Sequence, residues 1–424
     1  MYSMLSGGGP LTKEYILQRK KETFEGLGCL GQPVTLILDP HVKPVHAPVH
    51  RIPAGKREKV KKKLDEMVAA GKLTPVDEPT DWCSNMTVVE KVKPDGSVKL
   101  RLCLDPSQTL NKAVVIPKHT VPTLEEILPR FSAEKHKCFS IFDALDGFTQ
   151  VPLDDKSSFY TTMQTPWGRY RWLRLPYGVS SAPEEFQRRI QETLDGLNGI
   201  ANIADDILCF GLGDTWDEAE AEHDRHLLAL LERAGQRNLK LNPSKIQFKL
   251  PKISFMGHEF TEQGVLPDPA KVETISQMPQ PRDKKALQRF LGMINYLSPF
   301  CPALSSIIHP LYNLTHNDVP FVWSAVHSTA FRQATELVSS APCLAYFDLR
   351  KPITLQVDAS ETGLGGALLQ PDSTGKLQPV AFMSCQLKPN EALWAQIEKE
   401  ALAICAACAK WDLWLYRKKH HRPH

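Results

Sequence analysis

The alternation of hydrophobic and polar positions predicts short strands early in the chain. In residues 86–92 and 98–104, apolar and polar side chains alternate with the period of two that is typical of half-buried strands. The segment that joins them, Lys93-Pro-Asp-Gly-Ser97, contains the Asp-Gly pair that favours the positive φ of a tight turn. We therefore predict a β-hairpin over residues 86–104.

The rest of the chain mixes helices with further short strands. The expected helices cover residues 12–26, 56–68, 123–131, 182–194 and 215–235, and the expected strands are 138–143 and two hairpins, through 166–168 and through 200–210. This order of elements is typical of an α+β domain. Beyond Pro267 the pattern becomes helical, and a β-rich pattern starts again at Ile353.

These changes of pattern predict four segments. Residues 1–50 form an extended lead-in rich in Gly, Pro and His, residues 51–265 the mixed α+β part, residues 266–345 a helical part, and residues 346–424 a second β-rich domain. The chain has 424 residues, of which 42% are hydrophobic, and this is enough apolar material for roughly three domains.

Charge adds only a local feature to this picture. The formal net charge of +3 is too small to indicate a nucleic-acid-binding protein by itself. Six of the eight residues from Lys56 to Lys63 are basic, on a segment with apolar residues at helical spacing. This predicts one cationic helix face, which either contacts phosphate or is simply solvated.

The cysteines and the N-terminus indicate an intracellular chain. Ten cysteines are scattered without the rhythm of a disulfide framework. The first ten residues lack the pattern of a signal peptide, and the apolar run over residues 401–409 is far shorter than the roughly 20 residues that a bilayer requires. We expect a cytoplasmic or nuclear protein, not a secreted one, with no membrane partner.

Three aspartates are the first candidates for chemistry. Asp143 ends a predicted strand, and Asp205 and Asp206 stand at a predicted hairpin tip between apolar arms. Phosphoryl and nucleotidyl transfer use two divalent ions held by convergent carboxylates, because Mg²⁺ prefers hard oxygen ligands. The alternative is a solvated turn, since Asp is common in turns. A second adjacent pair, Asp154-Asp155, is expected in a loop.

A series of short motifs decides between these readings. In chain order they are Val76-Asp-Glu-Pro-Thr-Asp-Trp82, Lys93-Pro-Asp-Gly96, Leu100-Arg-Leu-Cys-Leu-Asp-Pro106, Leu110-Asn111, Phe139-Ser-Ile-Phe-Asp143, Gly147-Phe148, Leu173-Arg-Leu-Pro-Tyr-Gly-Val179, Ala182-Pro183, Phe186-Gln187, Ala204-Asp-Asp-Ile-Leu208, Phe255-Met-Gly-His258 and Phe290-Leu-Gly-Met-Ile-Asn-Tyr296. The ordered set resembles the reverse transcriptase of gypsy-type LTR retrotransposons, from about residue 11 to residue 418.

The resemblance implies a right-hand-like polymerase with fingers and palm over 51–265, thumb and connection helices over 266–345, and a truncated RNase H-like α/β domain over 346–424. It also implies an RNA-directed DNA polymerase that uses two Mg²⁺ ions, or Mn²⁺ in their place. The implied partners are an RNA template, a DNA or tRNA-type primer, deoxynucleoside triphosphates and RNA:DNA hybrid. The oligomeric state is left open.

Site roles follow from the same resemblance. Asp143, Asp205 and Asp206 match the metal-binding carboxylates. The matches to the nucleotide-binding residues are Lys93, Arg101, Phe148, Tyr177 and Gly178. Lys93 and Arg101 would contact the triphosphate, and Phe148 would exclude a 2′-hydroxyl. Met256-Gly257 resembles the hairpin that grips the primer terminus. Ile203 stands where the family usually has an aromatic residue.

The C-terminal part resembles the start of an RNase H domain. Its motifs are Leu355-Gln-Val-Asp-Ala-Ser360, Gly363-Leu-Gly-Gly-Ala-Leu-Leu-Gln370 and Glu398-Lys-Glu-Ala-Leu-Ala-Ile404. Asp358 and Glu400 match the first two metal ligands, and the family's other two carboxylates would fall beyond residue 424. We therefore expect weak metal binding and little RNA cleavage from this domain.

Two other functions remain open from the sequence. A catalytically inactive or domesticated remnant could bind RNA:DNA through the basic helix and the thumb-like helices. A ribonuclease H acting on RNA:DNA hybrids is the third hypothesis, and the absent carboxylates argue against it.

Overall fold

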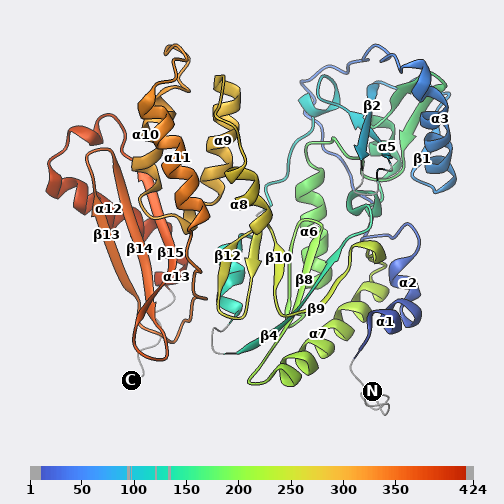
Figure 1. Cartoon of the computed structure of the whole chain (residues 1–424). Helices are drawn as coiled ribbons and strands as arrows, with labels where there is room; N and C mark the ends of the chain where they lie inside the picture. Colours follow the sequence, from blue (N-terminus) through green and yellow to red (C-terminus); the bar gives the residue numbers. More distant parts are fainter. Residues whose placement is uncertain (1–10, 93–95, 97, 120–121, 132–134, 417–424) are drawn as a thin grey trace. The chain divides into compact units, whose positions relative to one another are not determined.

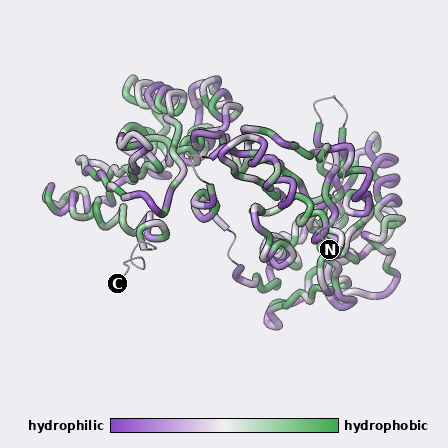
Figure 2. Tube along the Cα trace, turned by 90° about the horizontal axis from the view of Figure 1, so that it is seen from below, coloured by the Kyte–Doolittle hydropathy of each residue, from purple (hydrophilic) through white to green (hydrophobic). Residues whose placement is uncertain are grey.

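The computed structural model describes residues 11–92, 96, 98–119, 122–131 and 135–416 (Figure 1). The chain divides into two compact units. The first comprises Met1–Pro122, Ser140–Gly211 and Ala221–Lys249, and the second comprises Thr123–Phe139, Leu212–Glu220 and Leu250–His424. Among the described helices, none is both long enough and apolar enough to cross a membrane. Figure 2 shows that hydrophilic and hydrophobic residues alternate along the coloured part of the Cα trace.

The first unit is built on a five-stranded sheet and most of a four-stranded sheet, because residues 136–139, 212–213 and 250 of the latter belong to the second unit. The five-stranded sheet has the order β1-β6-β5-β2-β3 and the four-stranded sheet the order β7-β8-β4-β9. Their strands are β1 (Leu73–Pro75), β2 (Ser84–Val92), β3 (Val98–Asp105), β4 (His136–Asp143), β5 (Met163–Thr165), β6 (Gly168–Trp172), β7 (Ile200–Ile203), β8 (Asp206–Gly213) and β9 (Gln247–Leu250). The predicted hairpin is present, because β2 and β3 pair antiparallel from Val92 opposite Val98 to Asn85 opposite Asp105. Most of its turn lies outside the described residues.

Helices complete the first unit, and the first turn of the last one, residues 216–220, belongs to the second unit. They are α1 (Lys13–Arg19), α2 (Lys21–Phe24), α3 (Ala54–Ala69), α5 (Asp155–Tyr160), α6 (Ala182–Leu194) and α7 (Trp216–Gln236), with short 3₁₀ turns at Leu110–Lys112, Gly147–Gln150 and Pro243–Lys245. One apolar core joins Phe186 and Ile190 of α6, Ile207 of β8, and Leu227 and Leu230 of α7. This core fixes α6 and α7 beside the four-stranded sheet, as Figure 1 shows.

The basic helix packs by its apolar stripe. Val60, Leu64 and Met67 of α3 are buried, as the helical spacing predicts. The cationic face is partly neutralised, since Lys61 pairs with Asp65 and Lys63 pairs with Glu66 at 2.9 Å.

The second unit contains two three-stranded sheets and a set of helices. Its strands are β10 (Ile253–Phe255), β11 (His258–Phe260), β12 (Val265–Pro267), β13 (Thr354–Ala359), β14 (Gly363–Pro371) and β15 (Leu377–Gln386), paired in sequence order within each sheet. Its helices are α4 (Leu124–Ile127), α8 (Pro269–Ser276), α9 (Lys284–Tyr296), α10 (Leu304–Asn313), α11 (Ala325–Ser339), α12 (Gln396–Lys410) and α13 (Asp412–Tyr416), with 3₁₀ turns at Leu128–Arg130, Ser298–Phe300 and Glu391–Leu393.

Some expected elements differ from the structure. The helix expected over 12–26 is two short helices, α1 and α2, and the helix expected over 123–131 is α4 followed by a 3₁₀ turn. The prediction that Asp154-Asp155 lies in a loop is wrong, because Asp154 is the N-cap of α5 and accepts a hydrogen bond from the Ser157 amide at 2.7 Å. An aspartate at the N-cap of a helix accepts a hydrogen bond from a backbone amide of the first turn, which otherwise has no partner within the helix.

Candidate active site

The hairpin tip that carries the paired aspartates has a specific backbone shape. β7 and β8 pair antiparallel with Ile203 opposite Asp206, so Ala204 and Asp205 form the turn. Ala204 has a φ of 50°, in the left-handed region that costs a non-glycine residue about 1 kcal/mol or more. The Ala204 amide donates to Oε1 of Gln187 on α6 at 2.8 Å. Helix α6 therefore stabilises the turn that presents Asp205 and Asp206.

The structure brings Asp143 to the same place. Asp143 is the last residue of β4, which lies next to β8 in the sheet. The amide of the following residue, Ala144, donates to the carbonyl of Asp205 at 2.9 Å, and the Asn242 amide donates to the carbonyl of Asp143 at 2.8 Å. The three predicted carboxylates thus gather at one end of neighbouring strands.

The carboxylates repel one another. Burial, with the charges of Asp143 and Asp206, raises the pKa of Asp205 to about 6. Burial and Asp143 also raise the pKa of Asp206. Oδ1 of Asp205 is buried and has no hydrogen-bond partner among the described residues. A Cβ on Gly147 would stand 2.4 Å from that oxygen, so only glycine lets the carboxylate occupy this position.

Within the described chain, Lys245 is the one cation that we find at ion-pair distance from these carboxylates, and the charge of Arg101 acts on Asp205 from further away. Nζ of Lys245, in the 3₁₀ turn before β9, lies 2.5 Å from Oδ2 of Asp143. Asn242 Nδ2 donates to Oδ1 of the same carboxylate at 3.3 Å. Of the three carboxylates, Asp143 alone has an ion-pair partner among the described residues, and the side chain of that lysine is 53% exposed. Sequence reasoning missed Lys245 because nothing in its local pattern marks it.

The donor set fits a hard cation. All the candidate ligand atoms are carboxylate oxygens, which Mg²⁺ and Mn²⁺ prefer. The unpartnered Oδ1 of Asp205 and the raised pKa values show that the cluster lacks positive charge. Among the described residues, no group of three or more His, Cys, Asp or Glu side chains is arranged so that it could hold a metal ion as it stands, and this includes the three aspartates. In this arrangement Lys245 holds one oxygen of Asp143 that an ion would use.

A cationic cavity lies in the same unit. Its volume is about 110 Å³, and its lining includes Lys72, Lys99, Arg101, Asp146 and Tyr177. Lys72 Nζ lies 2.7 Å from Oδ2 of Asp146. Burial alone would raise the pKa of Asp146, but the hydrogen bond and charge of Lys72, with Lys99 and Arg101, outweigh it and lower that pKa. The cavity keeps a surplus of positive charge, which suits a phosphate group.

An aromatic cluster stands beside this cavity. The ring of Phe148 lies 5.0 Å from that of Tyr177 and 5.5 Å from that of Phe186. Burial, with the charges of Asp146 and Asp205, raises the pKa of Tyr177, so its hydroxyl stays protonated. Gly178 has a φ of 108°, and a Cβ there would stand 2.2 Å from the Leu104 carbonyl. The fold thus places Arg101, Phe148, Tyr177 and Gly178 together, whereas Lys93 lies outside the described residues.

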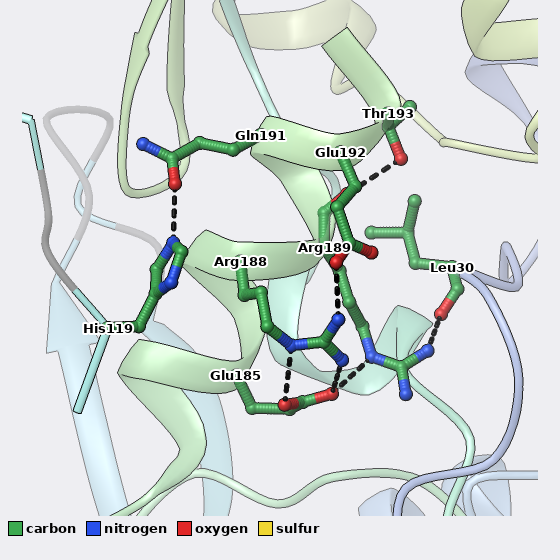
Figure 3. Close-up of polar contacts among 8 residues, drawn as sticks. All are labelled: Leu30, His119, Glu185, Arg188, Arg189, Gln191, Glu192 and Thr193. Atoms are coloured by element: carbon green, nitrogen blue, oxygen red, sulfur yellow. Dashed lines mark hydrogen bonds and ion pairs between the residues drawn. The ribbon is translucent and has the colours of Figure 1, made fainter. Parts of the chain in front are cut away.

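Helix α6 also anchors the lead-in (Figure 3). The Glu185 carboxylate accepts hydrogen bonds from Arg188 at 2.7 Å and from Arg189 at 2.5 Å, and the nearly buried Arg189 donates onward to the carbonyl of Leu30. Burial would raise the pKa of Glu185, but both arginines lower it. The helix that supports the aspartate turn is therefore itself fixed by a paired charge cluster.

The remaining predicted residues lie in the second unit. Met256 and Gly257 form the turn between β10 and β11. Asp358 is on β13 and Glu400 on α12. Both of these carboxylates are exposed, and within the described chain neither makes a hydrogen bond or ion pair. Their assignment as metal ligands stays a prediction.

Gln187, Asp146 and Lys72 were missed as site residues. Gln187 belongs to the Phe186-Gln187 motif, but the sequence assigned no role to its side chain. Asp146 carried a usable signal, since it is a second carboxylate three residues after the strand end at Asp143. No local sequence signal marks Lys72, because its partner Asp146 is 74 residues away.

Comparison with known proteins identifies the class. Residues 93–260 match the reverse transcriptase (RNA-dependent DNA polymerase) family, and residues 323–421 match the RNase H-like domain found in reverse transcriptase. The chain therefore carries a reverse transcriptase domain followed by an RNase H-like domain, and the predicted α+β polymerase fold is confirmed.

The relatives are retrotransposon polyproteins. The chain is 30% identical over 387 residues to the retrovirus-related Pol polyprotein from transposon opus of Drosophila melanogaster, covering 88% of this chain and 37% of the polyprotein. It is 27% identical over 366 residues to the transposon Tf2-3 polyprotein of Schizosaccharomyces pombe, covering 86% of this chain and 26% of that protein. The chain thus spans well under half the length of these relatives.

Solved structures share the fold at low identity. The foamy viral protease-reverse transcriptase in complex with dsDNA matches with a TM-score of 0.79 and 22% identity, over 94% of this chain and 82% of that one. The same viral protein in complex with RNA/DNA hybrid matches with a TM-score of 0.77 and 22% identity, over 93% of this chain and 52% of that one.

Proposed function

We propose that this chain is the RNA-directed DNA polymerase of a gypsy-type LTR retrotransposon, and that it extends a DNA or tRNA-type primer on an RNA template. The observation that carries the proposal is the electrostatically incomplete cluster of Asp143, Asp205 and Asp206. Among the described residues, only Asp143 has an ion-pair partner, the exposed Lys245, and the buried Oδ1 of Asp205 has no hydrogen-bond partner. A purely structural cluster would be neutralised by the fold itself.

Reverse transcriptases generally depend on divalent metal ions. In this proposal Asp143, Asp205 and Asp206 hold two Mg²⁺ ions, or Mn²⁺. Bound there, the ions would neutralise the charge that develops as the primer 3′-hydroxyl attacks the α-phosphate. The turn at Ala204, stabilised by Gln187, orients Asp205 and Asp206. Lys245 pairs with Asp143 in this structure and would compete with an ion for that carboxylate.

The incoming deoxynucleoside triphosphate would bind at the cationic cavity. Arg101 lines it and would contact the phosphate oxygens, with Lys93 in the same role. Phe148 and Tyr177 pack ring against ring and would form the floor below the sugar, where a 2′-hydroxyl would meet the Phe148 ring. Gly178 permits the close backbone approach that places Tyr177 there.

The remaining roles are part of the same proposal. Met256 and Gly257 would grip the primer terminus, and Asp358 with Glu400 would contribute metal ligands in the RNase H-like domain. Nucleic acid is the expected partner, and structures of the foamy viral relative in complex with RNA/DNA hybrid and with dsDNA support this.

Primer extension on an RNA template tests the function. The purified chain, the double variant Asp205→Asn/Asp206→Asn and the control Asp214→Asn are compared with Mg²⁺ and deoxynucleotides. Asp214 pairs with Lys135 at 3.7 Å and is 79% exposed, so its loss should change little. We expect extension by the wild type and the control and none by the double variant. A folded wild type that binds hybrid without extending it contradicts the proposal and favours a non-catalytic binding protein.

A further inference from the structure

The turn between β10 and β11 has an unusual backbone that is fixed from outside. Met256 has a φ of 49° and Gly257 a φ of 69°, so two successive residues occupy the left-handed region. The carbonyl oxygen of Met256 accepts a hydrogen bond from the hydroxyl of Tyr296, at the end of α9. Two left-handed residues in a row need such support, because only glycine adopts this conformation freely.

His258 gives the same carbonyl a second donor. Its Nδ1 lies 2.8 Å from the Met256 oxygen, and its ring lies 5.4 Å from that of Tyr296 and 5.3 Å from that of Phe300. Burial lowers the pKa of His258, which keeps the ring neutral with its proton on Nδ1. The turn is therefore clamped by an aromatic wall and has little freedom to change shape.

A lysine completes this wall. Nζ of Lys271, on α8, lies 3.7 Å from the centroid of the Tyr296 ring, within the range of a cation–π contact. A Cβ built on Gly257 would stand 2.0 Å from the same Nζ and 3.0 Å from the Tyr296 hydroxyl. The ammonium thus lies directly against the backbone of the turn, and glycine is required for it to do so.

The charge on Lys271 is not neutralised within the described chain. No carboxylate there lies within ion-pair distance of its ammonium. Asp268, the acid just before α8, is already engaged, since it accepts from the Ala270 amide and from the Ser254 hydroxyl, each at 3.0 Å. By contrast Lys252, next to the same sheet, pairs with Glu259 at 3.4 Å. Within the described chain, Lys252 therefore has a carboxylate partner, whereas Lys271 at the turn has none.

From this arrangement we propose that Lys271 binds a backbone phosphate of the primer strand and that Tyr296 positions both the ammonium and the Met256-Gly257 turn for that contact. A fixed cation with no carboxylate of its own is suited to a phosphodiester oxygen. The contact reads no sequence, because a phosphate is the same at every position. The location at the primer strand rests on the proposed function, whereas the phosphate contact itself does not require turnover.

Salt-dependent binding tests the proposal on the full chain. Fluorescence anisotropy with a labelled RNA–DNA primer-template gives Kd between about 50 and 200 mM salt, and the slope of log Kd against log salt counts the phosphates neutralised. Lys271→Met keeps an apolar chain over the Tyr296 ring but removes the charge. We expect Kd to rise roughly 3- to 10-fold and the slope to fall by about 1.

Three variants separate this role from a structural one. Lys271→Arg should restore the slope, and the matched control Lys252→Met should leave both Kd and slope unchanged. Tyr296→Phe, which keeps the ring but removes the bond to Met256, should weaken primer extension from a correctly paired terminus while the salt slope stays that of the wild type. Thermal unfolding of each variant shows that it is folded.

The outcomes are distinct from those of the polymerase assay. A wild-type slope in folded Lys271→Met, or an equal loss in Lys252→Met, overturns the proposal even if the chain extends primers. A reduced slope in Lys271→Met supports it even if the chain proves catalytically silent. A wild-type chain without salt-dependent binding to the duplex overturns it as well.

Discussion

Two partly buried aspartates in the first unit, Asp224 and Asp205, have pKa values that shift in opposite directions. Asp224 on α7 accepts hydrogen bonds from the Leu11 amide at 2.9 Å and from Lys249 Nζ at 2.8 Å, and its other oxygen lies 3.1 Å from Nδ1 of His223. Burial would raise the pKa of Asp224, but these partners lower it. Asp205 has an unpartnered oxygen among the described residues and a pKa raised to about 6.

Both carboxylates are partly buried, and the hydrogen-bond and ion-pair partners of Asp224 are what Asp205 lacks. A carboxylate that serves the fold receives its hydrogen bonds and counter-charge from the chain, as Asp224 does. A carboxylate that serves a ligand is left short of both, because the ligand supplies them. If the proposed function holds, the contrast separates an aspartate that holds the structure together from one that binds a metal ion, and this can be tested by experiment.

Loss of catalysis without loss of stability is the largest expected effect. In Asp205→Asn we expect primer extension to fall by about 10³-fold or more, because a metal ligand acts directly on the transition state. The free energy of unfolding should stay equal or rise, since one repelling charge is gone. Single-turnover extension and urea unfolding measure the two quantities. An activity within tenfold of the wild type would remove Asp205 from the site.

The reverse pattern is expected at the other aspartate. Asp224→Ala removes the carboxylate that accepts from the Leu11 amide and from Lys249 and that lies beside His223, so the free energy of unfolding should fall by about 3 kcal/mol. Extension per folded molecule should stay near that of the wild type. Asp217→Ala, in the exposed first turn of the same helix, is the control and should cost about 0.5 kcal/mol. Equal losses in both variants would contradict a structural role for Asp224.

The pH dependence of stability should also differ in sign. The folded state raises the pKa of Asp205 from 3.8 to about 6, so it binds that proton more tightly than the unfolded chain does. Its contribution to stability is therefore present at low pH and is lost as pH rises through this window. The lowered pKa of Asp224 does the opposite, and its contribution is lost as pH falls below about 4. Urea unfolding across pH, with Asp205→Asn and Asp224→Asn as references, should resolve both slopes. An unchanged profile in Asp205→Asn counts against the raised pKa.

The smallest expected effect concerns the two lysines. Lys245→Met removes the exposed cation on Asp143, a change of about 1 kcal/mol or less in stability. Mg²⁺ should then raise the melting temperature at lower concentrations than in the wild type, since no lysine competes. Lys249→Met removes the ammonium that donates to Asp224, so it should lower the melting temperature without changing the response to Mg²⁺. The same Mg²⁺ response in all three proteins would show that Lys245 does not compete for the metal.

Sequence reasoning found the candidate carboxylates but not what surrounds them. Asp143 and Asp205 could be predicted as site residues because they lie at the ends of apolar strands and because they belong to the ordered set of motifs. Lys245 was not visible, because it meets Asp143 across 102 residues and no local pattern records such a contact. The adjacent pair Asp154-Asp155 shows the converse, since a similar local sequence caps a helix there. Position along a strand is local information, whereas charge compensation is set by tertiary structure.

The bond from the Leu11 amide to Asp224 joins residues 213 positions apart. At typical ribosomal speeds of about 5–20 residues per second, the early segment would wait roughly 10–40 s before its partner is synthesised. During that time the segment has no docking surface on α7. This contact between the first described residue and α7 can therefore form only late in synthesis.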